Sequence, residues 1–489
     1  MRRRTTTSHA APARPRRRFL LALVGIGLLA AGVRVTYVVS VTRHDPLRGD
    51  AQYYSAMANT LARGDGFRDP FRQDRTVPSA DHPPLTAIVA APASWIAGTG
   101  ADAATRHRRE TAQRLTMALI GALAVVAIGF AARHLVPSDA DRVGLLAGLG
   151  AALHPGLWIN DGLVMSESVG ALTIALVIWV SLVVARQPTG WSMLALGATT
   201  GLAIMARAES ALLVIVLVIP LALTRRGDPD RRPPLGPVRW LAAGTLGVTL
   251  VIAPWVGSNL VRFNHPVTLS TNDGLTLVGT NCDPAWRGPG RGLWVLQCIE
   301  AVDSNGDGTN DWQAYLQGVS ATDPGQDPSD VAVKYRAAAA DYLRGHAGGL
   351  PEIMVVRVAR VMGVYGVRQM TDFYNLGEGR PRTASWLAAI GWWAIALVGS
   401  AGLVVLWRRR MPVWPLLAHV IAVTGVAAAF YGLWRFRIGA EIAMLMASAI
   451  AVDALLGRMS RRRSLGDEPV TVFVTEVDAP RSQPAALAD

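Results

Sequence analysis

The chain has 489 residues, of which 51% are hydrophobic and only 17% charged, and its mean hydropathy is +0.29. A soluble protein of this length buries a large core but seldom has so apolar a composition. The apolar residues are concentrated in repeated runs of roughly 17–25 residues, the length that a helix needs to cross a bilayer. The composition therefore argues against a soluble protein and predicts an all-α polytopic membrane protein.

The formal net charge of +13 raises the question of nucleic-acid binding, because basic surfaces attract phosphates. The arginines, however, gather at the ends of the apolar runs, as in membrane proteins with positively charged cytoplasmic loops. They form clusters at Arg2–Arg4, Arg14–Arg18, Arg225–Arg232, Arg408–Arg410 and Arg458–Arg463. This distribution argues against nucleic acid as a partner and predicts the orientation of the helices.

Residues 1–17 are basic and are predicted to be cytoplasmic, and the apolar run 18–40 is predicted to be a retained first helix. A cleaved signal peptide is the alternative, but the run is long for a signal core and no A-x-A-like site closes it. The polar segment that follows ends in a shorter apolar run, 85–98, which contains Pro92. That length suits an interfacial or re-entrant segment better than a span, so 41–98 is read as one outer loop.

Nine further apolar runs complete the predicted helices. They cover 114–136, 142–160, 164–186, 190–207, 209–224, 239–261, 385–407, 412–431 and 438–457. Ten helices place both termini and the later arginine clusters in the cytoplasm, whereas counting 85–98 as a span would put those clusters outside.

This count divides the chain into a few regions. An N-terminal transmembrane region, 18–261, is followed by a loop domain of mixed structure, 262–384, which the helix count places outside the cytoplasm. The C-terminal helices occupy 385–457, and the cytoplasmic tail 458–489 is predicted to be disordered because it becomes acidic and contains prolines.

The loop domain contains two segments with helical patterns and the only two cysteines. We expect one helix over Pro328–Arg344 and another over 351–368, lying on the membrane surface with Arg357, Arg360 and Arg368 among aliphatic residues. Cys282 and Cys298 are predicted to form a disulfide, because such bonds persist in oxidising compartments, with two free thiols as the alternative.

Two polar motifs lie in the first outer loop. Arg48-Gly49-Asp50-Ala51-Gln52-Tyr53-Tyr54 follows the first helix, and Asp81-His82-Pro83-Pro84-Leu85 opens the short apolar run. Carboxylates, a histidine and arginines gathered against a membrane surface are costly unless they have a function. We therefore expect this loop to contain a reaction centre.

These and other motifs resemble those of the GT-C fold glycosyltransferases, particularly the protein O-mannosyltransferase and aminoarabinose-transferase (ArnT-like) group and its actinobacterial branch. The resemblance is carried by Asp50-Ala51 with Tyr53, His82-Pro83-Pro84-Leu85, Ser166-Glu167, Arg207-Ala208-Glu209 and Arg435-Phe436-Arg437. The chain departs from the group at Gly49, where a second acidic residue is common, and at Gly439-Ala440-Glu441, where prolines are common. The resemblance implies inverting transfer of a sugar from a polyprenyl-phosphate donor to a protein, lipid or glycan acceptor, at the outer face of the plasma membrane.

Asp50 is the predicted general base, which takes the proton from the acceptor hydroxyl. Partial burial at the membrane surface is expected to raise the pKa of this carboxyl group toward a useful value. The alternative role is structural, since an aspartate at the start of a helix is a good N-cap.

The remaining candidate residues are predicted to bind donor or acceptor. Tyr53, Asp81 and His82 share the first outer loop, where a proline-rich turn is the structural alternative for Asp81 and His82. Glu167, Arg207 and Glu209 stand at helix ends, where the alternative is ion pairing that fixes the packing.

Arginines near the phosphate are needed to stabilise the leaving group, and their planar guanidinium binds phosphate through two hydrogen bonds. Arg435 and Arg437 are the first choice for this role, and Arg360 and Arg368 the second. Their alternative role is to reach toward the lipid head groups while their stems stay apolar.

The sequence leaves the use of a divalent cation open. Asp50, Asp81 and His82 lack the distinctive spacing of a metal site. The segment Asp303–Asp311 resembles the start of a calcium loop, but its twelfth position is Ala314 instead of glutamate, and a polar turn is the commoner structure.

A transporter or a lipid-linked-sugar flippase is the main alternative function, and a binding or assembly protein is another. Transporters often contain inverted repeats and broken helices near the middle of the membrane. Here the polar residues cluster at one face and no repeat is evident, which favours the transferase.

Overall fold

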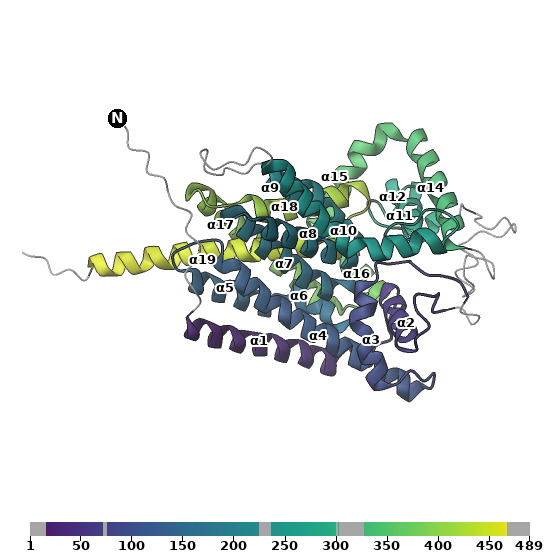
Figure 1. Cartoon of the computed structure of the whole chain (residues 1–489), viewed down its shortest axis with the longest axis horizontal. Coiled ribbons are helices and arrows are strands. Elements are labelled where there is room, and N and C mark those ends of the chain that lie inside the picture. Colours follow the sequence, from purple (N-terminus) through teal and green to yellow (C-terminus); the bar gives the residue numbers. More distant parts are fainter. Residues whose placement is uncertain (1–15, 72–75, 224–235, 300–301, 303–326, 467–489) are drawn as a thin grey trace, which may run out of the picture.

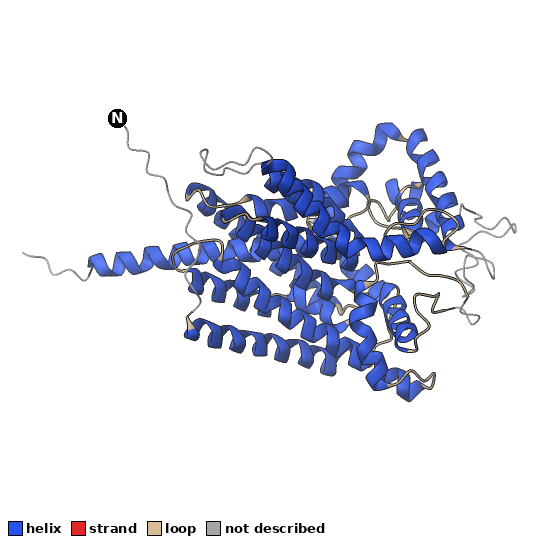
Figure 2. Ribbon diagram, viewed as in Figure 1, coloured by secondary structure: helices blue, strands red, loops and turns tan. Residues whose placement is uncertain are grey.

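The computed structural model describes residues 16–71, 76–223, 236–299, 302 and 327–466. Within these ranges the chain folds into a bundle of long helices with shorter helices gathered at one end (Figures 1 and 2). They contain no strand, and the only bridge is an isolated pair between Arg68 and Pro78. The predicted all-α membrane fold is confirmed.

In the N-terminal part of the bundle each predicted run is helical, but 142–160 and 209–224 are each divided into shorter helices. This part consists of α1 (Arg17–Tyr37) with its extension η1 (Val38–Thr42), α4 (Ala103–Arg133), α5 (Ala140–Leu153), α6 (Pro155–Trp158), η2 (Ile159–Gly162), α7 (Ser166–Arg186), α8 (Gly190–Ala206), η3 (Ala208–Ala211), η4 (Val214–Val218), α9 (Ile219–Leu223) and α10 (Gly236–Arg262). The C-terminal part adds α17 (Arg382–Arg408), α18 (Trp414–Ala429), η8 (Trp434–Arg437) and α19 (Ile438–Gly466).

Six helices in the described ranges are long and apolar enough to cross a membrane, judged by length and composition. They are α1 with η1, α4, α7, α10, α17 and α19 with η8, and the bent pair of α5 with α6 and η2 would make a seventh. The other predicted runs form shorter apolar helices, α8, η3 to α9, and α18. The α4 helix also begins eleven residues before its predicted start at residue 114, because the polar residues at its beginning continue the same helix beyond the apolar run.

Small residues allow α8 and α10 to approach each other closely. A side chain at Gly197 of α8 would collide with the backbone of Gly244 in α10, and one at Gly247 would collide with the backbone of α8. Close approach at small residues is a usual source of helix association in membranes, where burying apolar area gains little. This pair supports α8, whose C-terminal end leads into the site.

The segment between the two halves of the bundle is helical wherever it is described, without the mixed structure expected. Its helices are α11 (Asp273–Thr280), α12 (Asp283–Trp286), η6 (Leu296–Ile299), α14 (Pro328–Gly345), η7 (Ala347–Gly349), α15 (Leu350–Val361) and α16 (Val367–Glu378). They lie at the same end of the bundle as α2 (Asp50–Ala62) and α3 (Leu85–Ala97) (Figure 1). The two predicted outer loops therefore share one side. The predicted helix over Pro328–Arg344 is confirmed, whereas Asp303–Asp311 lies outside the described residues.

The predicted single helix over 351–368 is wrong. The chain forms α15 and α16, separated by a turn with Gly363 and Gly366 at positive φ. Arg357 and Arg360 are buried and do not reach toward lipid, because backbone carbonyl groups of other segments accept their hydrogen bonds. Apolar periodicity could not distinguish a helix on a lipid surface from one covered by protein.

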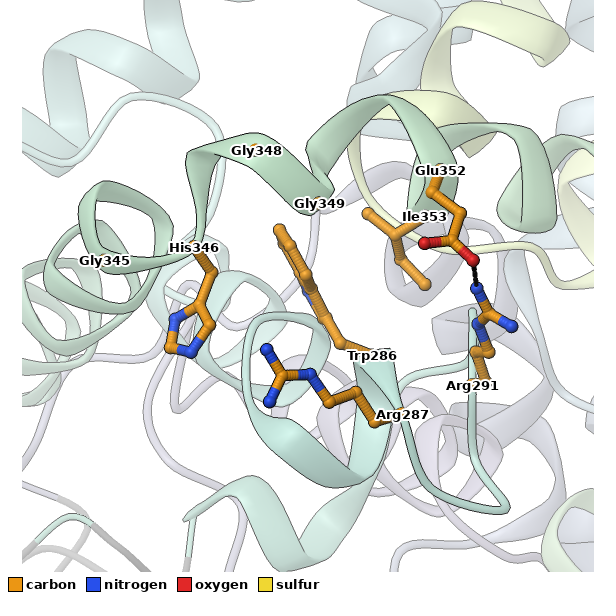
Figure 3. Close-up of a pocket in the computed structure, with 9 residues that line it drawn as sticks. All are labelled: Trp286, Arg287, Arg291, Gly345, His346, Gly348, Gly349, Glu352 and Ile353. Atoms are coloured by element: carbon orange, nitrogen blue, oxygen red, sulfur yellow. Dashed lines mark hydrogen bonds and ion pairs between the residues drawn. The ribbon is translucent and has the colours of Figure 1, made fainter.

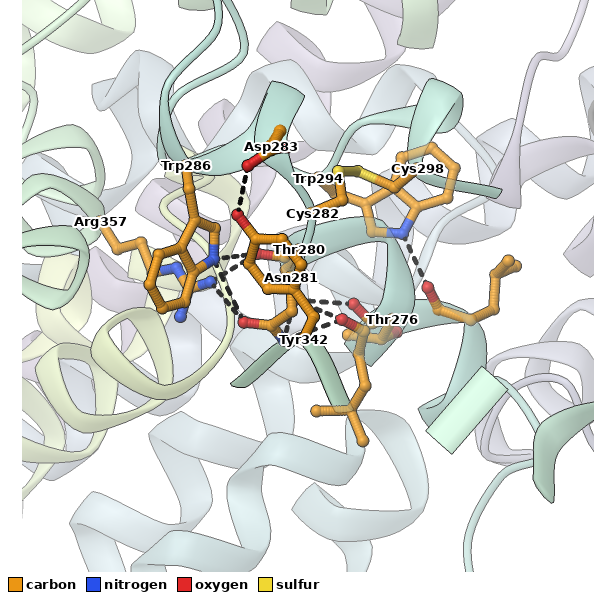
Figure 4. Close-up of a disulfide and its surroundings, with 12 residues drawn as sticks. Thr276, Thr280, Asn281, Cys282, Asp283, Trp286, Trp294, Cys298, Tyr342 and Arg357 are labelled. Atoms are coloured by element: carbon orange, nitrogen blue, oxygen red, sulfur yellow. Dashed lines mark hydrogen bonds between the residues drawn. A yellow bond between two sulfur atoms is a disulfide. The ribbon is translucent and has the colours of Figure 1, made fainter. Parts of the chain in front are cut away.

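The predicted disulfide between Cys282 and Cys298 is present and joins α12 to η6 (Figure 4). Next to it, the Trp286 indole N–H donates to the carbonyl oxygen of Thr280, at 3.1 Å. Arg357 donates to the same carbonyl, at 2.6 Å. The disulfide therefore belongs to a small polar core that connects α12 to α15.

Candidate active site

Asp50 and Arg435 form the ion pair at the centre of the site. Gly49 has φ of +54°, which turns the chain so that Asp50 becomes the first residue of α2. The carboxylate caps no backbone N–H group of its helix, and its Oδ2 lies 2.6 Å from Nη1 of Arg435. The alternative role of helix capping is therefore not adopted in this structure.

Other residues hold both partners of this pair in place. Nε2 of His82 lies 3.6 Å from Oδ1 of Asp50, and its ring stacks on Tyr54 with centroids 5.0 Å apart. Arg435 belongs to η8, and the backbone N–H of Arg435 donates to the hydroxyl of Tyr374 in α16. The two loops at this end of the bundle thus position one ion pair.

The pKa of Asp50 lies well below its ordinary value, opposite to the direction expected from the sequence. Burial of the carboxyl group alone would raise its pKa, but the charges of Arg435 and then His82 outweigh burial. Asp50 is therefore an ionised carboxylate in the unliganded protein.

The predicted residues at the ends of α7 and α8 join the site. Glu167 is fully buried at the start of α7, and its Oε1 lies 3.0 Å from Nη1 of Arg207. Nε of Arg207 lies 2.6 Å from Oε1 of Glu209. Breaking a buried ion pair by removing one partner typically costs about 3–5 kcal/mol, because a charge is left uncompensated.

Two charged residues that the sequence reading missed connect these pairs. Oε1 of Glu378, at the end of α16, lies 3.3 Å from Nη1 of Arg435. Glu378 also pairs with Arg380, which lies 3.8 Å from Glu167. The visible signal was the Glu378-Gly379-Arg380 sequence before the apolar run, in which Gly379 has φ of +75° and turns one charge toward the next.

A cavity of about 670 Å³ opens beside these charges. Its polar end contains Asp50, His82, Arg207 and Arg435, together with Glu209, Tyr54 and Ser166. An apolar wall comes from Ala211, Leu212 and Ile215 and from the end of α18 with Phe430, and a further, polar side comes from Ser270, Asn272, Asp273 and Thr276. Ile215 is 62% exposed, so the apolar wall continues to the outer surface of the bundle.

Tyr53 and Asp81 support this cavity without lining it. The Tyr53 hydroxyl lies 2.9 Å from Oγ of Ser79, and its ring meets His82 edge-on. Oδ1 of Asp81 accepts from the Thr271 hydroxyl at 3.1 Å. Burial raises the pKa of Asp81, although His82 partly opposes this. These contacts fix the outer loop against the segment before α11.

The other predicted arginines lie elsewhere. Arg437 is buried and pairs with Glu441 at 2.8 Å, while its guanidinium lies over Trp392. Arg360 donates to the carbonyl oxygen of Arg291 and to Gln369, and the exposed Arg368 does not line the cavity. Of the four arginines that the sequence suggested for the phosphate, only Arg435 lines the cavity.

Within the described residues, no three His, Cys, Asp or Glu side chains are arranged to hold a metal ion. Asp50 and His82 are adjacent, but Asp81 turns toward Thr271. The trio suggested by the sequence is therefore not assembled as a ligand set.

Comparison with known proteins gives two findings about this chain. Residues 81–256, which include His82, Glu167 and Arg207, match the model of the dolichyl-phosphate-mannose-protein mannosyltransferase family. No curated protein matches the chain in sequence.

Among solved structures, the fold is similar to the oligosaccharyltransferase of Archaeoglobus fulgidus. The form tethered with an acceptor peptide gives a TM-score of 0.52 at 15% identity, covering 92% of this chain and 51% of that one. The form in complex with Zn and sulfate gives 0.51 at 15% identity, covering 91% and 50%. The family match over residues 81–256 and this likeness of fold confirm the predicted resemblance to GT-C glycosyltransferases. The chain spans about half the length of the oligosaccharyltransferase.

Proposed function

We propose that the protein is an inverting glycosyltransferase that moves a sugar from a polyprenyl-phosphate donor to an acceptor outside the cytoplasm. The observation that carries the proposal is the central cavity, which joins the Asp50–Arg435 pair to an apolar wall. A site with this composition suits an amphiphilic substrate whose reacting group is anionic and whose tail is lipid.

The donor fits the cavity in one orientation. Its phosphate takes the polar end, where Arg435 and Arg207 supply guanidinium groups that bind phosphate oxygens through paired hydrogen bonds. Its polyprenyl chain follows Leu212, Ile215 and Phe430 toward the lipid. The description of the matching family makes mannose the first sugar to test.

Transfer then proceeds by a single displacement. The acceptor hydroxyl oxygen attacks the anomeric carbon from the face opposite the phosphate, while Asp50 takes the hydroxyl proton. The bond between the anomeric carbon and the phosphate oxygen breaks, and its electrons leave with polyprenyl phosphate. Arg435 stabilises the departing phosphate, and the anomeric configuration inverts.

Arg435 links donor binding to the strength of the base. In the unliganded site it neutralises Asp50 and lowers the pKa of that carboxyl group. A donor phosphate competes for the same guanidinium, so its binding frees Asp50 and lets the pKa rise. The base is thereby strengthened only when a donor is present.

The decisive experiment is sugar transfer from polyprenyl-phosphate mannose in membranes that contain wild type or Asp50→Asn. We expect the variant to lose about 10²–10⁴-fold in rate, the usual contribution of a positioned general base, with normal expression. Asp65→Asn is the matched control, because Asp65 lies in the same outer loop, pairs with Arg63 and does not line the cavity. Equal rates for Asp50→Asn and wild type would overturn the proposal.

A further inference from the structure

A second cavity, of about 550 Å³, lies in the loop domain (Figure 3). Its wall comes from α12 and the turn after it, and from the segment that joins α14 to α15. None of its lining residues lines the central cavity. The proposed transfer reaction leaves this second cavity without a role.

The floor of the cavity is apolar and fixed. It contains Trp286 and Ile353, which pack together with Cys298 beside the disulfide. The Trp286 indole N–H is bound by Thr280 and Asn281, so the ring cannot turn (Figure 4). Trp286 is only 6% exposed and Ile353 2%, so the floor closes the cavity from below and offers a ligand a small apolar contact.

Polar side chains of both hydrogen-bonding types surround this floor. The side chain of Arg287 is 71% exposed, and its Nη1 lies 3.9 Å from Oδ1 of Asp283. Arg291 pairs with Glu352 across the cavity wall (Figure 3). Nδ1 of His346 lies 2.9 Å from the Tyr342 carbonyl oxygen, which leaves Nε2 of the neutral ring as an acceptor.

The balance of charge selects the class of ligand. Glu352 neutralises Arg291, and Asp283 lies near Arg287, so the cavity has donors and acceptors but little net charge. An anionic ligand would therefore gain little, because both arginines already lie near carboxylates that offset their charge. A polyol whose hydroxyl groups both donate and accept would use the arginines, the carboxylate and the imidazole together.

We propose that this cavity binds a neutral saccharide, held through its hydroxyl groups by Arg287, Glu352 and His346 above the largely buried Trp286–Ile353 floor. The site is separate from the donor cavity. The next step rests on the proposed transferase function. If that function holds, the saccharide is part of the acceptor, and the loop domain tethers a glycan near the reaction centre.

The backbone between the two cavities supports such tethering. Gly292, next to Arg291, has φ of +80°, and its carbonyl oxygen accepts from the backbone N–H of Gly432 at 2.9 Å. Tyr431, the residue before Gly432, lines the central cavity. Arg360 donates to the carbonyl oxygen of Arg291 and fixes the same strip. One rigid backbone link therefore joins the walls of both cavities.

The test is calorimetric titration of the full-length protein in detergent with mannobiose and maltose, and with mannose 6-phosphate as the anionic probe. We expect a neutral disaccharide to bind in the millimolar range and to be preferred over the phosphorylated sugar. Arg287→Ala should weaken this binding about tenfold, because a charged hydrogen bond is lost at a site where removal disturbs no core contact. Glu352→Ala should weaken neutral binding and improve binding of mannose 6-phosphate, because Arg291 loses its counter-charge.

Two controls separate this proposal from the others. Arg344→Ala should bind like wild type, because Arg344 is an equally exposed arginine of the same domain that pairs with Asp341 and does not line the cavity. Asp50→Asn should also bind normally, so a failure of the transferase proposal leaves this result intact. No binding of either disaccharide up to tens of millimolar, preference for the phosphorylated sugar, or unchanged binding by Arg287→Ala would each overturn it.

Discussion

Arg435 contacts two carboxylates that come from opposite parts of the chain. Asp50 begins α2 in the first outer loop, and Glu378 ends α16 in the loop domain. A guanidinium shared by two carboxylates is oriented without belonging wholly to either. This sharing makes Glu378 a positioning residue for the arginine that we propose binds the donor phosphate.

Glu378→Gln should slow transfer about tenfold and raise the donor KM. Without the competing carboxylate, Arg435 binds Asp50 alone, and a donor phosphate must break a stronger pair. Glu378→Asp should restore part of the lost rate because it restores the charge, which a merely structural role would not predict. Steady-state kinetics with varied donor concentration provides the measurement, and an unchanged kcat/KM in Glu378→Gln would contradict the assignment.

The pH dependence of kcat/KM follows from the lowered pKa of Asp50. This profile reports the free enzyme, in which Arg435 and His82 hold the pKa below the ordinary aspartate value of about 4. A depressed pKa keeps the base ionised as pH falls, so the rate should stay constant from pH 7 to about 5. An acid limb centred above about pH 5.5 would show that the pKa is raised instead.

Local sequence reading found the residues whose motifs stand beside apolar runs, such as Asp50, His82 and Glu167. It missed Glu378, because a long polar segment contains many charges and no periodicity marks the one that turns inward. It also placed Arg437 at the phosphate, since Arg435 and Arg437 share one motif. Their different directions are set by Glu441 and Trp392, which only the folded chain brings to Arg437.

At the scale of elements, the short helix η8 is held by the loop domain. Its Trp434 indole donates to the carbonyl oxygen of Arg360, and the backbone N–H of Arg435 donates to Tyr374. The loop domain therefore supports the site. The sequence could not show this, since the partner groups lie about 60 to 75 residues away.

Tyr374→Phe tests this support. The change removes the hydroxyl that accepts from the backbone of Arg435 and leaves a buried N–H without a partner, which costs about 1–3 kcal/mol. We expect a lower unfolding temperature together with a lower transfer rate. Tyr365→Phe is the control, because the Tyr365 ring faces Arg360 and phenylalanine keeps that face. Equal thermal stability of both variants would show that the hydrogen bond does not hold η8.

At the scale of the whole molecule, the sequence predicted the helices better than their lengths. Every predicted run is helical, because high hydropathy over about twenty consecutive residues is a direct sign of a helix in the membrane. The short helices α8 and α18 fall below the length of a regular span, since they end where Arg207 and Phe430 turn the chain into the site. The sequence also predicted that the two outer loops lie on the same side, from the number of helices and the arginine clusters at their ends.

Orientation in the membrane can be measured on intact cells. Arg344→Cys in α14 should react with a membrane-impermeant maleimide, whereas Arg409→Cys, in the exposed turn after α17, should react only after the cells are opened. The wild type provides the background, because its two cysteines are joined in the disulfide. Labelling of Arg409→Cys on intact cells would place the site in the cytoplasm and contradict the proposed acceptor outside it.

The Asp50–Arg435 pair joins residues 385 positions apart, and this separation has a consequence for biosynthesis. The ribosome delivers α2 to the translocon early, but Arg435 of η8 emerges 385 residues after Asp50. On the proposed mechanism, a nascent chain carries the base without its arginine and cannot consume lipid-linked sugar. Competence would then begin only with the synthesis of η8, after every helix between α2 and η8 has been made.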